Sequence, residues 1–164
     1  MSETERTETK KSTKTKRRRT ISQLKVVVVG SFVAEDDKPY VIGDAEAVGA
    51  LPMLKELMDN ADREVFVCLH LSTKNQLISW EIVSVGSLNS SIVHPRELFK
   101  GAILANAASV VIAHNHPSGD STPSGADIQL TRRLVKAGDV LGIEVLDHVV
   151  FGDEVISMRE MSLF

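Results

Sequence analysis

A short apolar run followed by two histidines and a turn-rich loop constrains this chain more than any other feature. The run, Val110–Ile112, is β-branched and ends at a loop, which is typical of a buried strand. His114 and His116 are two residues apart, and in extended backbone such side chains lie on one face and can bind one ion. The loop 117–123 is rich in Pro, Gly and Ser, which favour tight turns. We expect it to return Asp127 to the histidines.

Two histidines, an aspartate and one position for water match a hydrolytic zinc site, which takes three protein ligands. Structural zinc needs four, usually with cysteine, and no cysteine pair follows the histidines. That absence also argues against a zinc nucleobase deaminase. Hydrolysis further needs a base for the water and a hydrogen-bond donor for the oxyanion. Ser124 is a candidate donor, and Glu64 or Glu97 a candidate base; spacing does not decide between the two.

The same residues allow a purely structural interpretation. Pairs of histidines often only pack or hydrogen-bond, and Ser124 with Asp127 comes close to a capping box at the start of a helix. Asp127 would then stabilise the helix dipole. The residues by themselves leave both interpretations open.

Strands and helices alternate along the chain, which predicts an α/β fold with a mixed β-sheet flanked by helices on both faces. Pro52, inside the helical stretch capped by Asp44, predicts a break into two short helices. Ser124 is expected to cap a helix that ends at Gly138. We expect strands at 24–29, 63–71, 76–85, 109–113, 144–151 and 155–158, the second and third forming a hairpin, and helices at 44–60, from Pro95 onward, and at 124–138.

Charge divides the chain into a basic tail and an acidic body. Residues 1–20 hold eight Lys or Arg and three Glu, a net charge of +5, whereas residues 21–164 hold eleven Lys or Arg and nineteen Asp or Glu, a net charge of −8. We expect a disordered tail and one folded domain over 21–164. The basic residues within 10–19 could contact DNA phosphates, although a tail that only improves solubility fits slightly better.

The single cysteine, Cys68, excludes an internal disulfide framework and favours a reducing cytoplasm. No apolar run approaches the roughly 20 residues of a membrane span. The polar N-terminus also lacks the apolar segment of a secretory signal. We therefore predict a cytoplasmic protein without membrane contact, and leave a homo-oligomer open.

The spacing H-x-H-x7-S-x2-D, which begins at His114 and ends at Asp127, resembles the JAMM motif of MPN/JAB-domain metallohydrolases. The surrounding sequence is similar to the RadC branch of that family, from about residue 21 to the C-terminus and most densely from 63 to 150. The segments that carry the similarity are His94–Glu97, Ala113–Asp120, Thr131–Leu134 and Leu146–His148.

The resemblance implies a cytidine-deaminase-like JAB/MPN fold and one Zn²⁺ per chain, held by His114, His116 and Asp127. It implies the oxyanion role for Ser124. In JAMM domains the glutamate that acts as the base for the water lies at the start of a strand, some fifty residues before the first histidine. Glu64 occupies that position. The resemblance therefore favours Glu64 as the base.

Four further residues are candidates for contacts to the substrate or to the metal ligands. Glu97 then becomes a helix-start or substrate-side residue. Asn115 and Ser118 flank the histidines and could hydrogen-bond substrate or water. His148 is expected to make a structural hydrogen bond rather than to bind metal.

The function implied by the resemblance is zinc-dependent cleavage of a peptide or isopeptide bond in an unknown protein or peptide, with a link to DNA repair through the family name. Full-length RadC proteins carry a helix-hairpin-helix region ahead of the JAB domain, and here a basic tail and about forty residues take that place. A second hypothesis is a DNA-associated accessory factor with the tail as an electrostatic tether. A metal-dependent nuclease lies between the two.

Overall fold

The computed structural model describes residues 38–86 and 93–164. The predicted strand at 24–29, the basic tail and the DNA contact at 10–19 lie outside these residues. The proposed division of the chain at residue 20 therefore stays a prediction.

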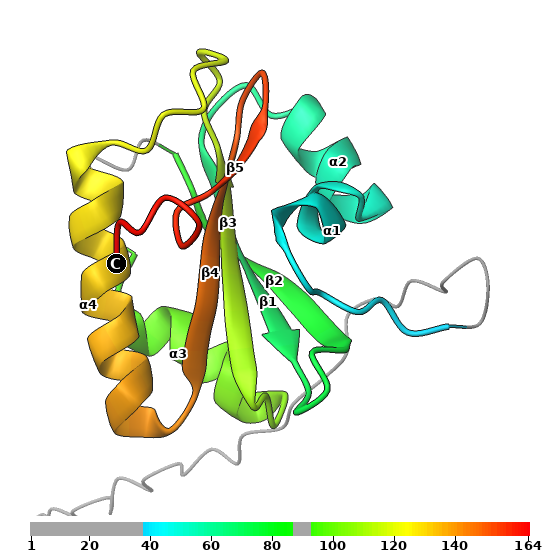
Figure 1. Cartoon of the computed structure of the whole chain (residues 1–164), viewed down its shortest axis with the longest axis vertical. Coiled ribbons are helices and arrows are strands. Elements are labelled where there is room, and N and C mark those ends of the chain that lie inside the picture. The colour runs from blue at the N-terminus through cyan, green and yellow to red at the C-terminus, as the bar shows by residue number, and fades with distance from the viewer. Residues whose placement is uncertain (1–37, 87–92) are drawn as a thin grey trace, which may run out of the picture. The chain divides into compact units, whose positions relative to one another are not determined.

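A five-stranded sheet in the order β2-β1-β3-β4-β5 forms the centre of the described chain (Figure 1). Neighbouring strands are antiparallel except β3 and β4, which are parallel and joined through a helix. β1 and β2 form the expected hairpin. The strands are β1 (Val65–Leu71), β2 (Leu77–Val85), β3 (Ser109–Asn115), β4 (Glu144–Phe151) and β5 (Val155–Ser157).

Helices cover both faces of this sheet, as Figure 1 shows. On one face, α1 and α2 pack on the odd-numbered side chains of β1, among them Val67 and Leu69. On the other face, α3 and α4 pack on the even-numbered ones, among them Phe66 and Cys68. The mixed α/β architecture predicted from the alternation of elements is thus confirmed. The helices are α1 (Ala45–Gly49), α2 (Pro52–Asp59), α3 (Pro95–Leu104) and α4 (Gly125–Leu141).

Local chemistry explains most helix boundaries. The Asp44 side chain accepts a hydrogen bond from the Ala47 N–H and caps α1. Pro52 is the first residue of α2, where its missing N–H costs nothing. The predicted break at this proline is therefore confirmed. None of the helices within the described residues combines the length and apolar character needed to cross a bilayer.

Three predicted boundaries were wrong by two residues or more, and the first is the start of β1, which lies at Val65 rather than at residue 63. α4 continues past Gly138 to Leu141 and ends at Gly142, whose φ of 70° is the left-handed conformation that terminates helices. β3 continues past Ala113 to Asn115, because β4 provides partners for the two extra residues at Val150 and Phe151. His114 therefore belongs to a strand paired on both sides.

Gly138 instead serves close packing between α4 and the start of β4. A Cβ at this position would collide with the carbonyl oxygen of Ile143 and lie 3.2 Å from the Phe99 ring. We expect Gly138→Ala to lower the free energy of unfolding by roughly 1–3 kcal/mol, the usual range for overpacking, despite the better helix propensity of alanine. Chemical denaturation monitored by circular dichroism measures this change.

Gly125→Ala, in the same helix, is the matched control. A Cβ at Gly125 would meet no atom within 4 Å, so the free energy of unfolding should change by less than about 1 kcal/mol. Equal effects of the two substitutions would contradict the packing role of Gly138.

Candidate metal centre

His114, His116 and Asp127 bring their ligand atoms within 4.8 Å of one another and form a group that could hold a metal ion. The two Nε2 atoms are 3.0 Å apart. Asp127 Oδ1 lies 3.5 Å from His114 Nε2, and Asp127 Oδ2 lies 3.6 Å from His116 Nε2. Ligand atoms about 2.0–2.1 Å from a tetrahedral zinc ion would be about 3.3–3.4 Å apart, close to these separations.

The side chains of His114 and His116 lie on the same face because His114 belongs to β3 and His116 directly follows the end of this strand. His114 lies on the face of the sheet covered by α3 and α4, where its ring stacks on Phe66 at 6.0 Å between centroids. The His116 N–H donates to the Phe151 carbonyl at 2.7 Å and thus continues the pairing of β3 with β4. Alternation then places the two imidazoles side by side.

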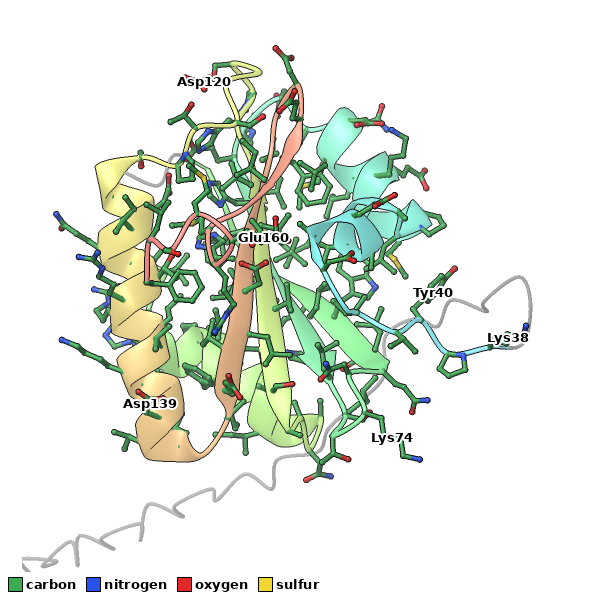
Figure 2. The ribbon with its side chains drawn as sticks, in the orientation of Figure 1. Lys38, Tyr40, Lys74, Asp120, Asp139 and Glu160 are labelled. Carbon is green, nitrogen blue, oxygen red and sulfur yellow. The ribbon has the colours of Figure 1, made fainter. Side chains whose placement is uncertain are left out.

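The loop after His116 is fastened to the turn between β4 and β5. The Asp153 N–H donates to the Gly119 carbonyl at 2.7 Å. Ser121 Oγ donates to the Glu154 carbonyl at 2.8 Å and accepts from the Glu154 N–H at 3.0 Å. Figure 2 labels Asp120 in this loop, at the opposite end of the fold from Asp139 near the end of α4. The loop thereby returns the chain to the start of α4, where Asp127 lies.

Ser124 and Asp127 form a full capping box at the start of α4. Asp127 Oδ2 accepts from the Ser124 N–H at 2.7 Å, and Ser124 Oγ accepts from the Asp127 N–H at 3.2 Å. The structural interpretation of this pair is therefore correct. It does not exclude a metal role, because the box uses only one carboxylate oxygen of Asp127.

The other oxygen gives an independent test of whether a metal fits. Asp127 Oδ1 is one of three buried side-chain atoms without a hydrogen-bond partner within 38–86 and 93–164, and such an orphan is costly unless something binds it. His116 Nδ1 lies 2.6 Å from the Asp120 carbonyl, which can only accept, so Nδ1 carries the proton and Nε2 a lone pair. These atoms suit a cation, and the set of two imidazoles and one carboxylate suits zinc.

Burial keeps the inner imidazoles neutral, the form that binds metal. It lowers the pKa of His114 to about 4, although the nearby Asp127 carboxylate favours the charged form. It also holds the pKa of His148 well below its ordinary value, with His114 acting in the same direction. Both imidazoles are therefore uncharged at neutral pH, with one ring nitrogen that carries a hydrogen and one that has a free lone pair.

Glu64 immediately precedes β1, which runs antiparallel to β3 with Phe66 opposite His114. Glu64 is two residues before Phe66, and strand alternation continued by one residue predicts that its side chain lies on the face of the sheet that carries the histidines. The Asn115 side chain holds this segment: its Oδ1 accepts from the Val65 N–H at 2.7 Å, and its Nδ2 donates to the Arg63 carbonyl at 3.2 Å. The amide of Asn115 is thus bonded to backbone on both sides of Glu64.

The remaining candidates have other partners. Glu97 is exposed, and its carboxylate pairs with Arg96 at 3.1 Å and with Lys100 at 3.0 Å. Ser118 is exposed in the loop, where its Oγ accepts weakly from the Asp120 N–H at 3.4 Å. His148 is fully buried beside His114, with 2.8 Å between Nε2 and Nδ1.

Three residues around the site were given no functional role in the sequence-based prediction: Thr131, Asp120 and Ser121. Asp120 and Ser121 act through the loop contacts described above. Thr131 lies one helical turn after Asp127, with its Oγ1 at 2.6 Å from His148 Nδ1. The i, i+4 spacing from Asp127 was visible in the sequence, but the contact with β4 was not.

A family model described as the RadC-like JAB domain matches residues 44–163, which include the metal-binding group. A UPF0758 protein from Desulforamulus reducens is 56% identical over 101 residues, which cover 62% of this chain and 44% of that protein. UPF0758 protein YsxA from Bacillus subtilis is 49% identical over 143 residues, covering 85% of this chain and 61% of that protein.

A further UPF0758 protein, from Methanosarcina acetivorans, is 55% identical over 96 residues, which cover 58% of this chain and 42% of that protein. The chain spans about half the length of the curated relatives it matches. The fold, the motif spacing and the family match agree, and the chain belongs to the RadC-like JAB domain family.

Proposed function

We propose that this protein is a zinc-dependent hydrolase of the JAMM type that cleaves an amide bond in a peptide or isopeptide. The observation that carries the proposal is the buried Oδ1 of Asp127, which has no hydrogen-bond partner and lies 3.5 Å from His114 Nε2, itself 3.0 Å from His116 Nε2. Membership of the JAB family, which includes metallohydrolases, supports the same function.

His114, His116 and Asp127 would hold the ion as the three protein ligands of a catalytic site. When bound, zinc would supply Lewis-acid polarisation of the substrate carbonyl and a lowered pKa for the attacking water. The three protein ligands carry a single negative charge between them, so that a divalent ion leaves the site positive, which favours an electron-rich carbonyl oxygen.

Glu64 would act as the base that removes a proton from the attacking water and delivers it to the leaving amine. Its support is positional: Asn115 ties the backbone on both sides of Glu64 to the end of β3. Glu97 is a weaker candidate, because its carboxylate is paired with two cations on its own helix.

Ser124 would donate a hydrogen bond to the oxyanion. Its Oγ accepts from the Asp127 N–H, and this leaves the hydroxyl hydrogen available to an acceptor outside the helix. The residue is exposed, whereas Asp127 beside it is fully buried. Ser124 thus lies where the buried group meets the surface.

The test uses protein stripped of metal and then supplied with one equivalent of Zn²⁺. It is incubated with a peptide mixture that includes branched peptides joined through a lysine Nε, and mass spectrometry identifies new termini. We expect cleavage that depends on zinc and stops when a chelator is added. Failure to bind zinc would overturn the proposal, and chelator-sensitive cleavage of DNA in place of peptides would favour the nuclease hypothesis.

A further inference from the structure

A closed ring of contacts begins and ends at Asp127. Thr131 Oγ1 lies 2.6 Å from the Asp127 carbonyl oxygen and 2.6 Å from His148 Nδ1. His148 Nε2 lies 2.8 Å from His114 Nδ1, and His114 Nε2 faces Asp127 Oδ1 at 3.5 Å. All four residues are fully buried. The ring therefore connects α4, β4 and β3 out of reach of bulk water.

The hydrogens in this ring have a single consistent direction. Two oxygens 2.6 Å apart need a hydrogen between them, and the Asp127 carbonyl has none, so the Thr131 hydroxyl donates to it. The one hydrogen of Thr131 is then used, and Oγ1 must accept from His148 Nδ1–H. A neutral imidazole carries one ring hydrogen, so His148 Nε2 is an acceptor and takes the hydrogen of His114 Nδ1.

The direction of these hydrogen bonds decides which ring nitrogen of His114 is free to bind a metal ion. With its hydrogen on Nδ1, neutral His114 has a lone pair on Nε2, directed at Asp127 Oδ1 and His116 Nε2. The reverse direction would place the hydrogen of His114 on Nε2 and block that position. The Thr131 hydroxyl therefore selects between the two tautomers of His114. It acts through His148 and not through a contact with His114 itself.

We propose that Thr131 and His148 are positioning residues of the metal centre, which hold His114 in the Nδ1–H tautomer and keep its Nε2 free for the ion. The inference rests on the proposed function for the metal itself, and adds two residues that bind neither metal nor substrate. Groups that orient metal-binding histidines in this way commonly change metal affinity by about 10- to 100-fold.

The first test measures the dissociation constant for Zn²⁺ alone, by competition with a chromophoric chelator, in the unsubstituted protein and two variants. Thr131→Val keeps the shape of the side chain but removes the hydroxyl, and we expect about 10- to 100-fold weaker zinc binding. Thr131→Ser keeps the hydroxyl and should restore nearly full affinity. Equal affinity of Thr131→Val and the unsubstituted protein would overturn the inference.

A double-substitution cycle separates positioning from packing. Because Thr131 acts through His148, adding Thr131→Val to His148→Phe should weaken zinc binding no further. Additive losses would show that the two side chains act independently of each other, and would overturn the inference.

Nitrogen-15 NMR of the histidine rings in the metal-free, unsubstituted protein gives a reading that needs no variant to fold. We expect the His114 hydrogen on Nδ1, and finding it on Nε2 would overturn the inference. If the unsubstituted protein binds no zinc at all, the proposed function fails first and the inference with it. If it binds zinc but Thr131→Val has no effect, only the inference fails.

Discussion

His116→Ala protein should bind zinc at least about a hundredfold more weakly than the unsubstituted protein, since losing a ligand should cost more than losing an outer contact. His116 Nε2 lies 3.0 Å from His114 Nε2 and 3.6 Å from Asp127 Oδ2. Its side chain is 12% exposed, so its removal disturbs the core less than removal of the fully buried His114. His114→Ala should lose zinc as well, with a further cost to folding.

The measurement is zinc content by elemental analysis, together with the dissociation constant for the free ion. The matched control is His94→Ala, because His94 is exposed at the start of α3, outside the metal-binding group. That variant should retain about one zinc per chain. Zinc lost equally from both variants would indicate adventitious binding to surface imidazoles and would contradict the assigned site.

Glu64→Gln should keep zinc and lose about 10²- to 10⁴-fold in turnover, the usual contribution of a general base. Glutamine preserves the shape of the side chain but cannot accept a proton at neutral pH. The residue is not part of the group formed by His114, His116 and Asp127. Metal content and catalysis should therefore separate in this variant, unlike in His116→Ala.

Glu97→Gln provides the control for this second experiment. Its carboxylate contacts Arg96 and Lys100 on the surface of α3, and surface pairs of this kind contribute little to stability. Both zinc binding and peptide cleavage should stay near those of the unsubstituted protein. A large loss of turnover in Glu97→Gln with full activity in Glu64→Gln would reverse the assignment of the base.

Features that depend on neighbouring residues were predictable from the sequence. Pro52 separates α1 from α2 because a proline ring cannot continue a helix. The Ser124–Asp127 capping box needs only the i, i+3 spacing. The shared face of His114 and His116 follows from the two-residue period of a strand. The group of metal-binding residues could be predicted for the same reason, because the loop after His116 was expected to return Asp127 to the two histidines.

Element boundaries were less predictable where partners distant in sequence decide them. β3 extends through His114 and Asn115 because β4 supplies partners, and no local pattern reveals that pairing. Gly138 was predicted to end a helix because glycine commonly follows the last helical residue. Helix α4 nevertheless continues through it, and the glycine allows close packing against Ile143. A glycine at a contact and a glycine at a cap look alike in the sequence.

The sequence by itself determined the chemistry available to this protein: two imidazoles, one carboxylate and a hydroxyl, at spacings set by the periods of strand and helix. The tertiary structure alone decided how these groups are oriented. Asn115 binds the backbone around Glu64 across fifty residues of chain, and His148 reaches His114 from a different strand. Such contacts depend on the order and register of the strands. Both are set by the pairing of the whole sheet and its packing against the helices, and not by any local run of residues.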